Sequence, residues 1–146
     1  MPPLRLAFYR GAGLSAWAIR TVTWSAYDHV ALLLPDGSVL DVEPGAGVSE
    51  HAATRTPDAV CTVDAPDVVL AEALAWARGQ TGKPYDWLAD LGVLLHRDWR
   101  AEGAWQCSEM ATHAFEVAGR PLLNAAHVNR VTPGMLAMSP MLAPGP

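Results

Sequence analysis

Apolar and polar residues alternate most regularly over residues 29–43. Two apolar runs, 29–34 and 39–43, flank Pro35-Asp36-Gly37, a sequence typical of a hairpin turn. A three-residue loop there pairs Leu32 with Leu40 and puts the apolar positions of both strands on one face. The opposite face of this predicted hairpin then holds one imidazole and two carboxylates, from His29, Asp41 and Glu43.

Helical spacing of apolar residues predicts four further elements, over 14–23, 66–79, 86–95 and 107–118, and short strands are expected over 4–9 and 59–63. In the first helix, Leu14, Ala18 and Ile19 share a side. Asp86 is a suitable N-cap for the third helix. The pattern is that of an α+β chain in which an antiparallel sheet packs against helices. The Pro/Gly-rich end, 137–146, is expected to be loosely held.

The helix predicted over 107–118 begins at a cysteine. Its inward side is predicted to consist of Cys107, Met110, Ala111, Ala114 and Ala118, and its outward side of Glu109, His113, Glu116 and Arg120. The thiol is therefore expected at a helix N-terminus, facing the interior of the protein.

Composition narrows the class of protein. A chain of 146 residues with 51% hydrophobic and 17% charged residues fits one globular domain, residues 1–146, and neither a disordered tail nor a membrane span. The net charge of −5 and the lack of a basic patch argue against nucleic-acid binding. Two cysteines are too few for a disulfide framework, and no C-x-x-C zinc motif is present. No N-terminal secretion signal is recognisable.

The residues on the hairpin and the cysteine helix suggest thiol chemistry. A cysteine is nucleophilic as the thiolate, which helix N-terminal N–H groups and a nearby imidazolium both stabilise. A third polar group fixes the orientation of the imidazole. Cys107 and His29 supply the first two groups, and either Asp41 or Glu43 the third.

The other candidate side chains have simpler explanations. We expect Cys61 to be a buried core residue, Ser108 to cap its helix, and His113 to be solvated. His51 and His96 lie in apparent loops and are expected to be inert, whereas His127 is the one rival base. Each of Trp87, Trp99 and Trp105 fits either a groove wall or the core.

Two segments resemble the NlpC/P60 superfamily of papain-like cysteine peptidases. They are residues 82–87, Gly-Lys-Pro-Tyr-Asp-Trp, and residues 105–109, Trp-Gln-Cys-Ser-Glu. The resemblance implies that Cys107 is the nucleophile and that Tyr85 borders the active site near the oxyanion position. Leu88 and Ala89 replace the glycines usual in the family, so access to substrate near Tyr85 is expected to differ.

The order of the motifs resembles a circularly permuted branch of this superfamily. Residues 28–33, Asp-His-Val-Ala-Leu-Leu, are similar to the family's histidine strand but precede Cys107. That order is found in YiiX-like bacterial proteins and in lecithin–retinol acyltransferase-like enzymes. The third polar residue there lies about a dozen positions after the histidine, which favours Asp41, 12 positions after His29, over Glu43.

The resemblance implies a cysteine hydrolase that cleaves an amide bond of peptidoglycan stem peptides through an acyl-enzyme, with no metal and no cofactor. Two alternatives remain: a lipid acyltransferase or thioesterase, which the net charge of −5 disfavours, and a non-catalytic phage-tail domain. The C-terminal residues 130–140 resemble a tail of some phage proteins. We therefore expect either delivery by phage-tail or other secretion machinery, or a cytoplasmic role.

Overall fold

The computed structural model of the protein describes residues 3–95, 101–124 and 131–146. Within these residues the strands form a six-stranded antiparallel sheet in the order β4-β3-β2-β1-β5-β6. The elements along the chain are β1 (Arg5–Tyr9), α1 (Leu14–Thr23), β2 (His29–Leu33), β3 (Ser38–Glu43), β4 (Gly47–Ala52), β5 (Ala59–Val63), α2 (Asp67–Arg78), α3 (Trp87–Leu94), α4 (Cys107–Val117), α5 (Pro133–Ala137) and β6 (Leu142–Pro144). The predicted α+β class is confirmed.

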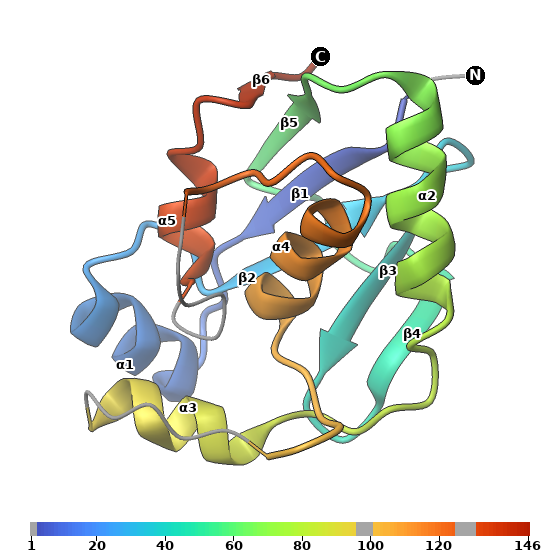
Figure 1. The fold of residues 1–146 in the computed structure, drawn as a ribbon. Coiled ribbons are helices and arrows are strands. Elements are labelled where there is room, and N and C mark those ends of the chain that lie inside the picture. The colour runs from blue at the N-terminus through green and yellow to red at the C-terminus, as the bar shows by residue number, and fades with distance from the viewer. Residues whose placement is uncertain (1–2, 96–100, 125–130) are drawn as a thin grey trace.

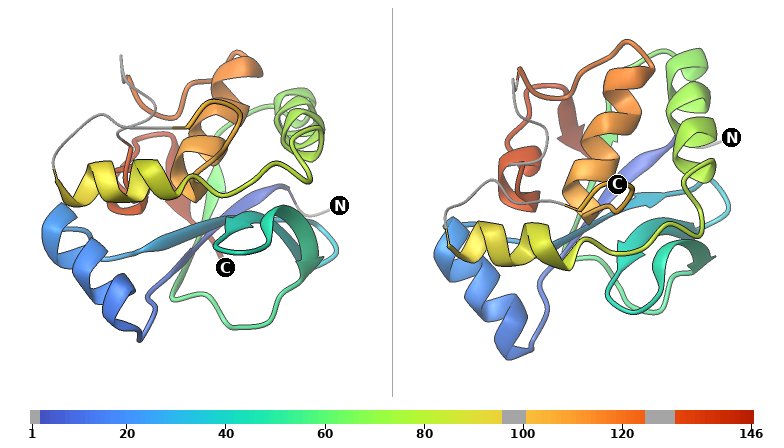
Figure 2. Two further views of the ribbon diagram at one scale, coloured as in Figure 1. Left: turned by 90° about the horizontal axis from the view of Figure 1, so that it is seen from below. Right: turned by 60° about the horizontal axis from the view of Figure 1, so that its bottom comes forward.

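Helices α2, α4 and α5 lie over one face of the sheet, and α1 and α3 lie side by side at one end of the molecule (Figures 1 and 2). The main core fills the space between the sheet and α4. Phe8, Leu32 and Leu40 of the sheet pack there with Met110 and Phe115 of α4. Helix α4 therefore rests directly on β2 and β3, the two strands of the predicted hairpin.

The hairpin has the register that the apolar alternation predicted. Leu32 pairs with Leu40, and the N–H of Leu34 donates to the carbonyl of Ser38 across the turn. Gly37 adopts a φ of 86°, a conformation that favours glycine in this loop. The ladder between β2 and β3 pairs residues 32–33 with 39–40, so His29 and Asp41 lie beyond its last pair.

The predicted helices are found with small shifts at their ends. The carboxylate of Asp86 accepts a hydrogen bond from the N–H of Ala89, which confirms it as a capping group at the start of α3. The inward side of α4 is also as predicted, but Glu109 is not on the outside: its exposed fraction is 3%. That part of the prediction was wrong because α4 is enclosed by other elements on more than one side.

Two strands were missed. Strand β4 pairs along the whole of β3, although its residues 49–51, Ser-Glu-His, lack the apolar alternation that marks a strand. Strand β6 pairs with β5, and the N–H of Gly145 donates to the carbonyl of Val60. Residues 142–144, within the segment 137–146 that was expected to be loosely held, are therefore part of the sheet.

The segment that carries Tyr85 is held between β4 and the chain before α4. On one side, the N–H of Val48 donates to the carbonyl of Lys83. On the other, Tyr85 forms a parallel bridge with Trp105, two residues before Cys107. Gly47 permits the close approach to β4, because a Cβ there would lie 2.3 Å from the carbonyl oxygen of Lys83.

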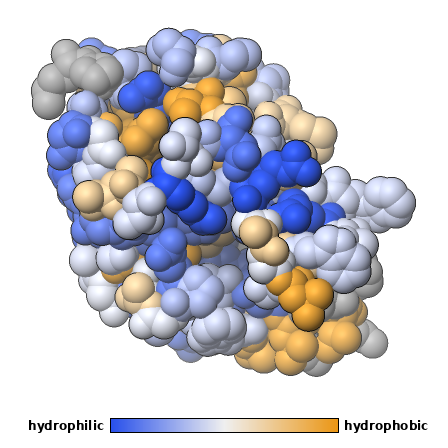
Figure 3. Space-filling view, turned by 180° about the vertical axis from the view of Figure 1, so that it is seen from behind, coloured by the Kyte–Doolittle hydropathy of each residue, from blue (hydrophilic) through white to orange (hydrophobic). Residues whose placement is uncertain are grey.

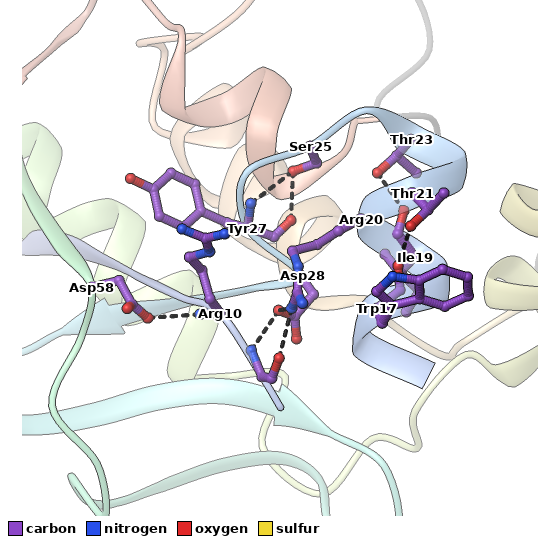
Figure 4. A network of polar contacts seen from close by, with 11 residues as sticks. Arg10, Trp17, Ile19, Arg20, Thr21, Thr23, Ser25, Tyr27, Asp28 and Asp58 are labelled. Atoms are coloured by element: carbon purple, nitrogen blue, oxygen red, sulfur yellow. Dashed lines mark hydrogen bonds and ion pairs between the residues drawn. The ribbon is translucent and has the colours of Figure 1, made fainter. Parts of the chain in front are cut away.

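Helix α1 buries none of its side chains. It is tied to the sheet by Arg20, whose guanidinium contacts Asp28 at 2.8 Å, while the same carboxylate accepts the N–H of Gly11 (Figure 4). Leu14 is 80% exposed, whereas Ala18 and Ile19, with which it was predicted to share a side, are half-buried. Trp17 on α1 and Leu91 on α3 are also exposed. Figure 3 shows an apolar area at the lower right, the end of the molecule where α1 and α3 lie. None of the described helices has the length and apolar character needed to cross a membrane.

Two glycines allow the contact at β4 to be tested. Gly47 and Gly45 both have positive φ values, 70° and 84°, but only a Cβ at Gly47 meets another atom within 4 Å. We expect Gly45→Ala to lose about 1–2 kcal/mol of unfolding free energy from backbone strain alone. Gly47→Ala should lose more, because its methyl group also displaces Lys83. Urea unfolding measures both, and equal losses would contradict the close packing.

Candidate active site

Cys107 is the first residue of α4, with Gln106 as the N-cap. N–H groups in the first turn of a helix have no partner within it, so they stabilise negative charge at this end. The residue is 8% exposed and lines a pocket together with Tyr85, Asp90 and Gln106. The sulfur thus lies at a helix N-terminus, in a pocket lined by both polar and apolar side chains.

His29 is bound to Asp41. Its Nε2 lies 2.7 Å from Oδ2 of the carboxylate, and the two residues are only 8% and 3% exposed. Burial by itself lowers the pKa of an imidazole. The negative charge of Cys107 and hydrogen bonds with Asp41 and Cys107 outweigh this effect and raise the pKa of His29 from 6.5 to about 10. The ring is therefore an imidazolium at neutral pH, between a sulfur and a carboxylate.

The same carboxylate has a second imidazole partner. Nε2 of His51, on β4, lies 3.1 Å from Oδ1 of Asp41. Sequence reasoning missed this residue because it placed His51 in a loop, whereas it lies on a strand next to β3. The alternation that grouped His29 with Asp41 could not find it, since β4 shows no clear alternation of its own.

Tyr85 lines the same pocket as Cys107, and its hydroxyl donates to Oδ2 of Asp90 at 2.5 Å. The side-chain amide of Gln106 donates to the other oxygen of this carboxylate, also at 2.5 Å. Burial raises the pKa of Asp90, with a smaller contribution from Asp86. Burial and the charges of Cys107 and Asp90 raise the pKa of Tyr85, so the phenol keeps its proton. Neither Asp90 nor Gln106 was singled out from the sequence.

The remaining candidates lie elsewhere or have other partners. Ser108 donates its hydroxyl to the carbonyl of Val131, so it holds α4 to the C-terminal segment. His113 packs against two indole rings and contacts Glu116 at 3.1 Å. Cys61 is half-buried, and Trp87 is 62% exposed, whereas Trp105 packs against Trp76. Three further candidates lie outside the described residues: His96, Trp99 and His127.

The donor set around Asp41 also allows a second kind of chemistry. One ligand atom from each of His29, Asp41 and Glu43 lies within 4.8 Å of the others. One imidazole nitrogen and two carboxylate oxygens form a set that Zn²⁺, Mn²⁺ or Fe²⁺ accepts. The site therefore has the groups for thiol chemistry and a donor set with the character of a metal centre.

Comparison with known proteins gives one informative result. No protein-family model matches the chain, and no curated protein does. Among solved structures, the chain is similar to the metalloprotein YiiX from Escherichia coli O157:H7, with a TM-score of 0.72 and 16% identity over 99% of this chain and 96% of that one. This chain has a YiiX-like fold. At this identity the likeness to YiiX concerns the fold alone, and the resemblance to NlpC/P60 peptidases rests on the sequence motifs.

The raised pKa of His29 can be tested directly. Because it is higher in the folded state than the ordinary 6.5, the stabilisation from the charged ring is fully present below pH 6.5 and is lost as the pH rises through about 10. We expect NMR titration of the ring to give a midpoint near 10, and a lower one in Cys107→Ala, which lacks the strongest interaction that raises it. A midpoint near 6.5 in the wild type would contradict this account.

Proposed function

We propose that this protein is a thiol hydrolase in which Cys107 is the nucleophile, His29 the general base and acid, and Asp41 the group that orients His29. One observation carries the proposal: a buried imidazole lies between a helix N-terminal cysteine and a carboxylate, and its pKa is raised by both. Glu43 is the alternative third member, but the contact of 2.7 Å is made by Asp41.

The mechanism follows from these positions. The thiolate attacks a carbonyl carbon, and the N–H of Cys107 stabilises the oxyanion that forms. His29, as the imidazolium, protonates the leaving amine or alcohol, and a bond to sulfur replaces the bond that is broken. Water then gives a proton to His29 and attacks the acyl-enzyme, which releases the acid and restores the thiol pair.

Two side chains that line the pocket, Tyr85 and Gln106, are candidates for a second oxyanion donor. The resemblance assigns this role to Tyr85, whose proton is directed at Asp90. The Gln106 amide carries two protons, of which Asp90 accepts one, so the other is free for a substrate oxygen.

The substrate we propose is an amide bond of peptidoglycan stem peptides, on the strength of the NlpC/P60-like motifs. An acyl ester is the second class, and one observation favours it: Ile19 and Thr23 of α1 line the pocket of Cys107, and α1 adds Leu14 and Trp17 to the apolar surface nearby. Assays of muropeptides and acyl esters in parallel separate the two classes.

The nucleophile is tested with two cysteine variants. We expect Cys107→Ala to lower hydrolysis by at least ~1000-fold, whereas Cys61→Ala, the matched control, keeps full activity. In the wild type, iodoacetamide should modify Cys107 at pH ~6, well below the ordinary thiol pKa of ~8.5. Cys61, whose pKa burial raises, should not react there. Reaction of Cys107 only at alkaline pH would favour the non-catalytic alternative.

A metal site is the second candidate function. The similar structure is described as a metalloprotein, and His29, Asp41 and Glu43 form a fitting donor set in this chain. A bound ion would take one ring nitrogen of His29 and an oxygen of Asp41, so metal binding and the proposed hydrolysis would compete for one ring.

Calorimetry with Zn²⁺ and the variant Glu43→Gln tests this second candidate. If the protein is a thiol hydrolase, we expect hydrolysis to persist in EDTA and Zn²⁺ to inhibit it. Glu43→Gln should weaken only the inhibition, because Glu43 would be a ligand of the ion, whereas Asp41 is the partner of His29. Loss of hydrolysis in EDTA, restored by Zn²⁺, would instead make the metal site the functional centre.

A further inference from the structure

Both ring nitrogens of His51 face hydrogen-bond acceptors. Nδ1 lies 2.9 Å from the carbonyl oxygen of Ala52, and Nε2 lies 3.1 Å from Oδ1 of Asp41. A neutral imidazole carries one donor and one acceptor, so in that form one of these contacts would set two lone pairs against each other. The imidazolium satisfies both contacts at once.

The two oxygens of the Asp41 carboxylate each contact a different histidine. It lies on the strand between those of the two histidines, with Oδ2 on His29 and Oδ1 on His51. A carboxylate that is 3% exposed requires partners for its oxygens, because water does not supply them. The contact with His51 therefore restricts rotation of the Asp41 carboxylate. Because that rotation would move Oδ2 away from His29, the contact also fixes the hydrogen bond between Asp41 and His29.

We propose that His51 is a positioning residue of the thiol site: by donating to Oδ1, it holds the Asp41 carboxylate in the orientation that binds His29. The inference rests on the proposed function and extends it from three residues to four. The contacts then run in the order Cys107, His29, Asp41 and His51.

The surroundings of His51 favour its charged form. The hydrogen bond with the carbonyl of Ala52 contributes most to raising its pKa, and burial opposes this. Asp41 and Glu43, on the adjacent strand β3, raise the pKa further. The neighbouring charge on β4, Glu50, is paired with Arg78 of α2 at 2.7 Å. The side chain of His51 is 30% exposed, so protons reach it from solvent, unlike the buried His29.

The role of His51 is tested with His51→Gln and His51→Ala. The glutamine amide can still donate to Oδ1 of Asp41 but does not titrate, whereas alanine removes the donor. We expect His51→Ala to shift the NMR signal of the His29 Nε2 proton and to lower kcat about tenfold with KM unchanged. His51→Gln should keep the wild-type His29 signal and the wild-type kcat.

The matched control is His113→Gln, which removes a partly exposed histidine outside the site. It should change neither the His29 signal nor kcat. An unshifted His29 signal and full kcat in His51→Ala would overturn the inference, and so would a loss in His51→Gln equal to that in His51→Ala. If His51→Ala does not fold, His51→Leu, which also removes the donor but keeps more of the side-chain volume, takes its place. If Cys107→Ala retains hydrolysis, the proposed function fails, while the His29 signal in the two His51 variants still tests how Asp41 is positioned.

Discussion

The buried hydrogen bond between His29 and Asp41 is the interaction on which the rest of the site depends. Burial of an imidazole and a carboxylate is unfavourable unless each finds a partner of opposite charge. Here the strands β2 and β3 bring the two together, and α4, packed on the same strands, adds the sulfur of Cys107. Three elements from distant parts of the sequence thus supply the partners that a buried, charged imidazole requires.

The segments that surround this centre are fixed mainly by main-chain contacts. The bridge between Tyr85 and Trp105 aligns the chain before α3 with the chain before α4, and Gly47 lets β4 approach the same segment. The carboxylate of Asp90 then joins Tyr85 to Gln106, beside the nucleophile. The pocket is therefore built from rigid pairings on one side, while α1 closes it on the other.

The central part of this arrangement was predictable because it rests on short-range rules. A period of two and a Pro-Asp-Gly turn suffice to put His29 beside Asp41, and helical spacing suffices to start a helix at Cys107. His51 and Asp90 could not be found in this way. The strand of His51 has no clear alternation, and the role of Asp90 depends on a bridge between Tyr85 and Trp105, which are 20 residues apart in the sequence. The buried position of Glu109 and the pairing of β6 likewise arise from tertiary contacts that no local pattern records.

Helix α1 has a further consequence for the wall of the pocket. It buries no side chain, and a single ion pair between Arg20 and Asp28 joins its side chains to the residue before His29. The side chains of this pair are only 19% and 10% exposed, so salt screens the pair little. The difference from α4 lies in packing, because most side chains of α4 are buried. Backbone amides of α1 will therefore exchange with deuterium before those of α4.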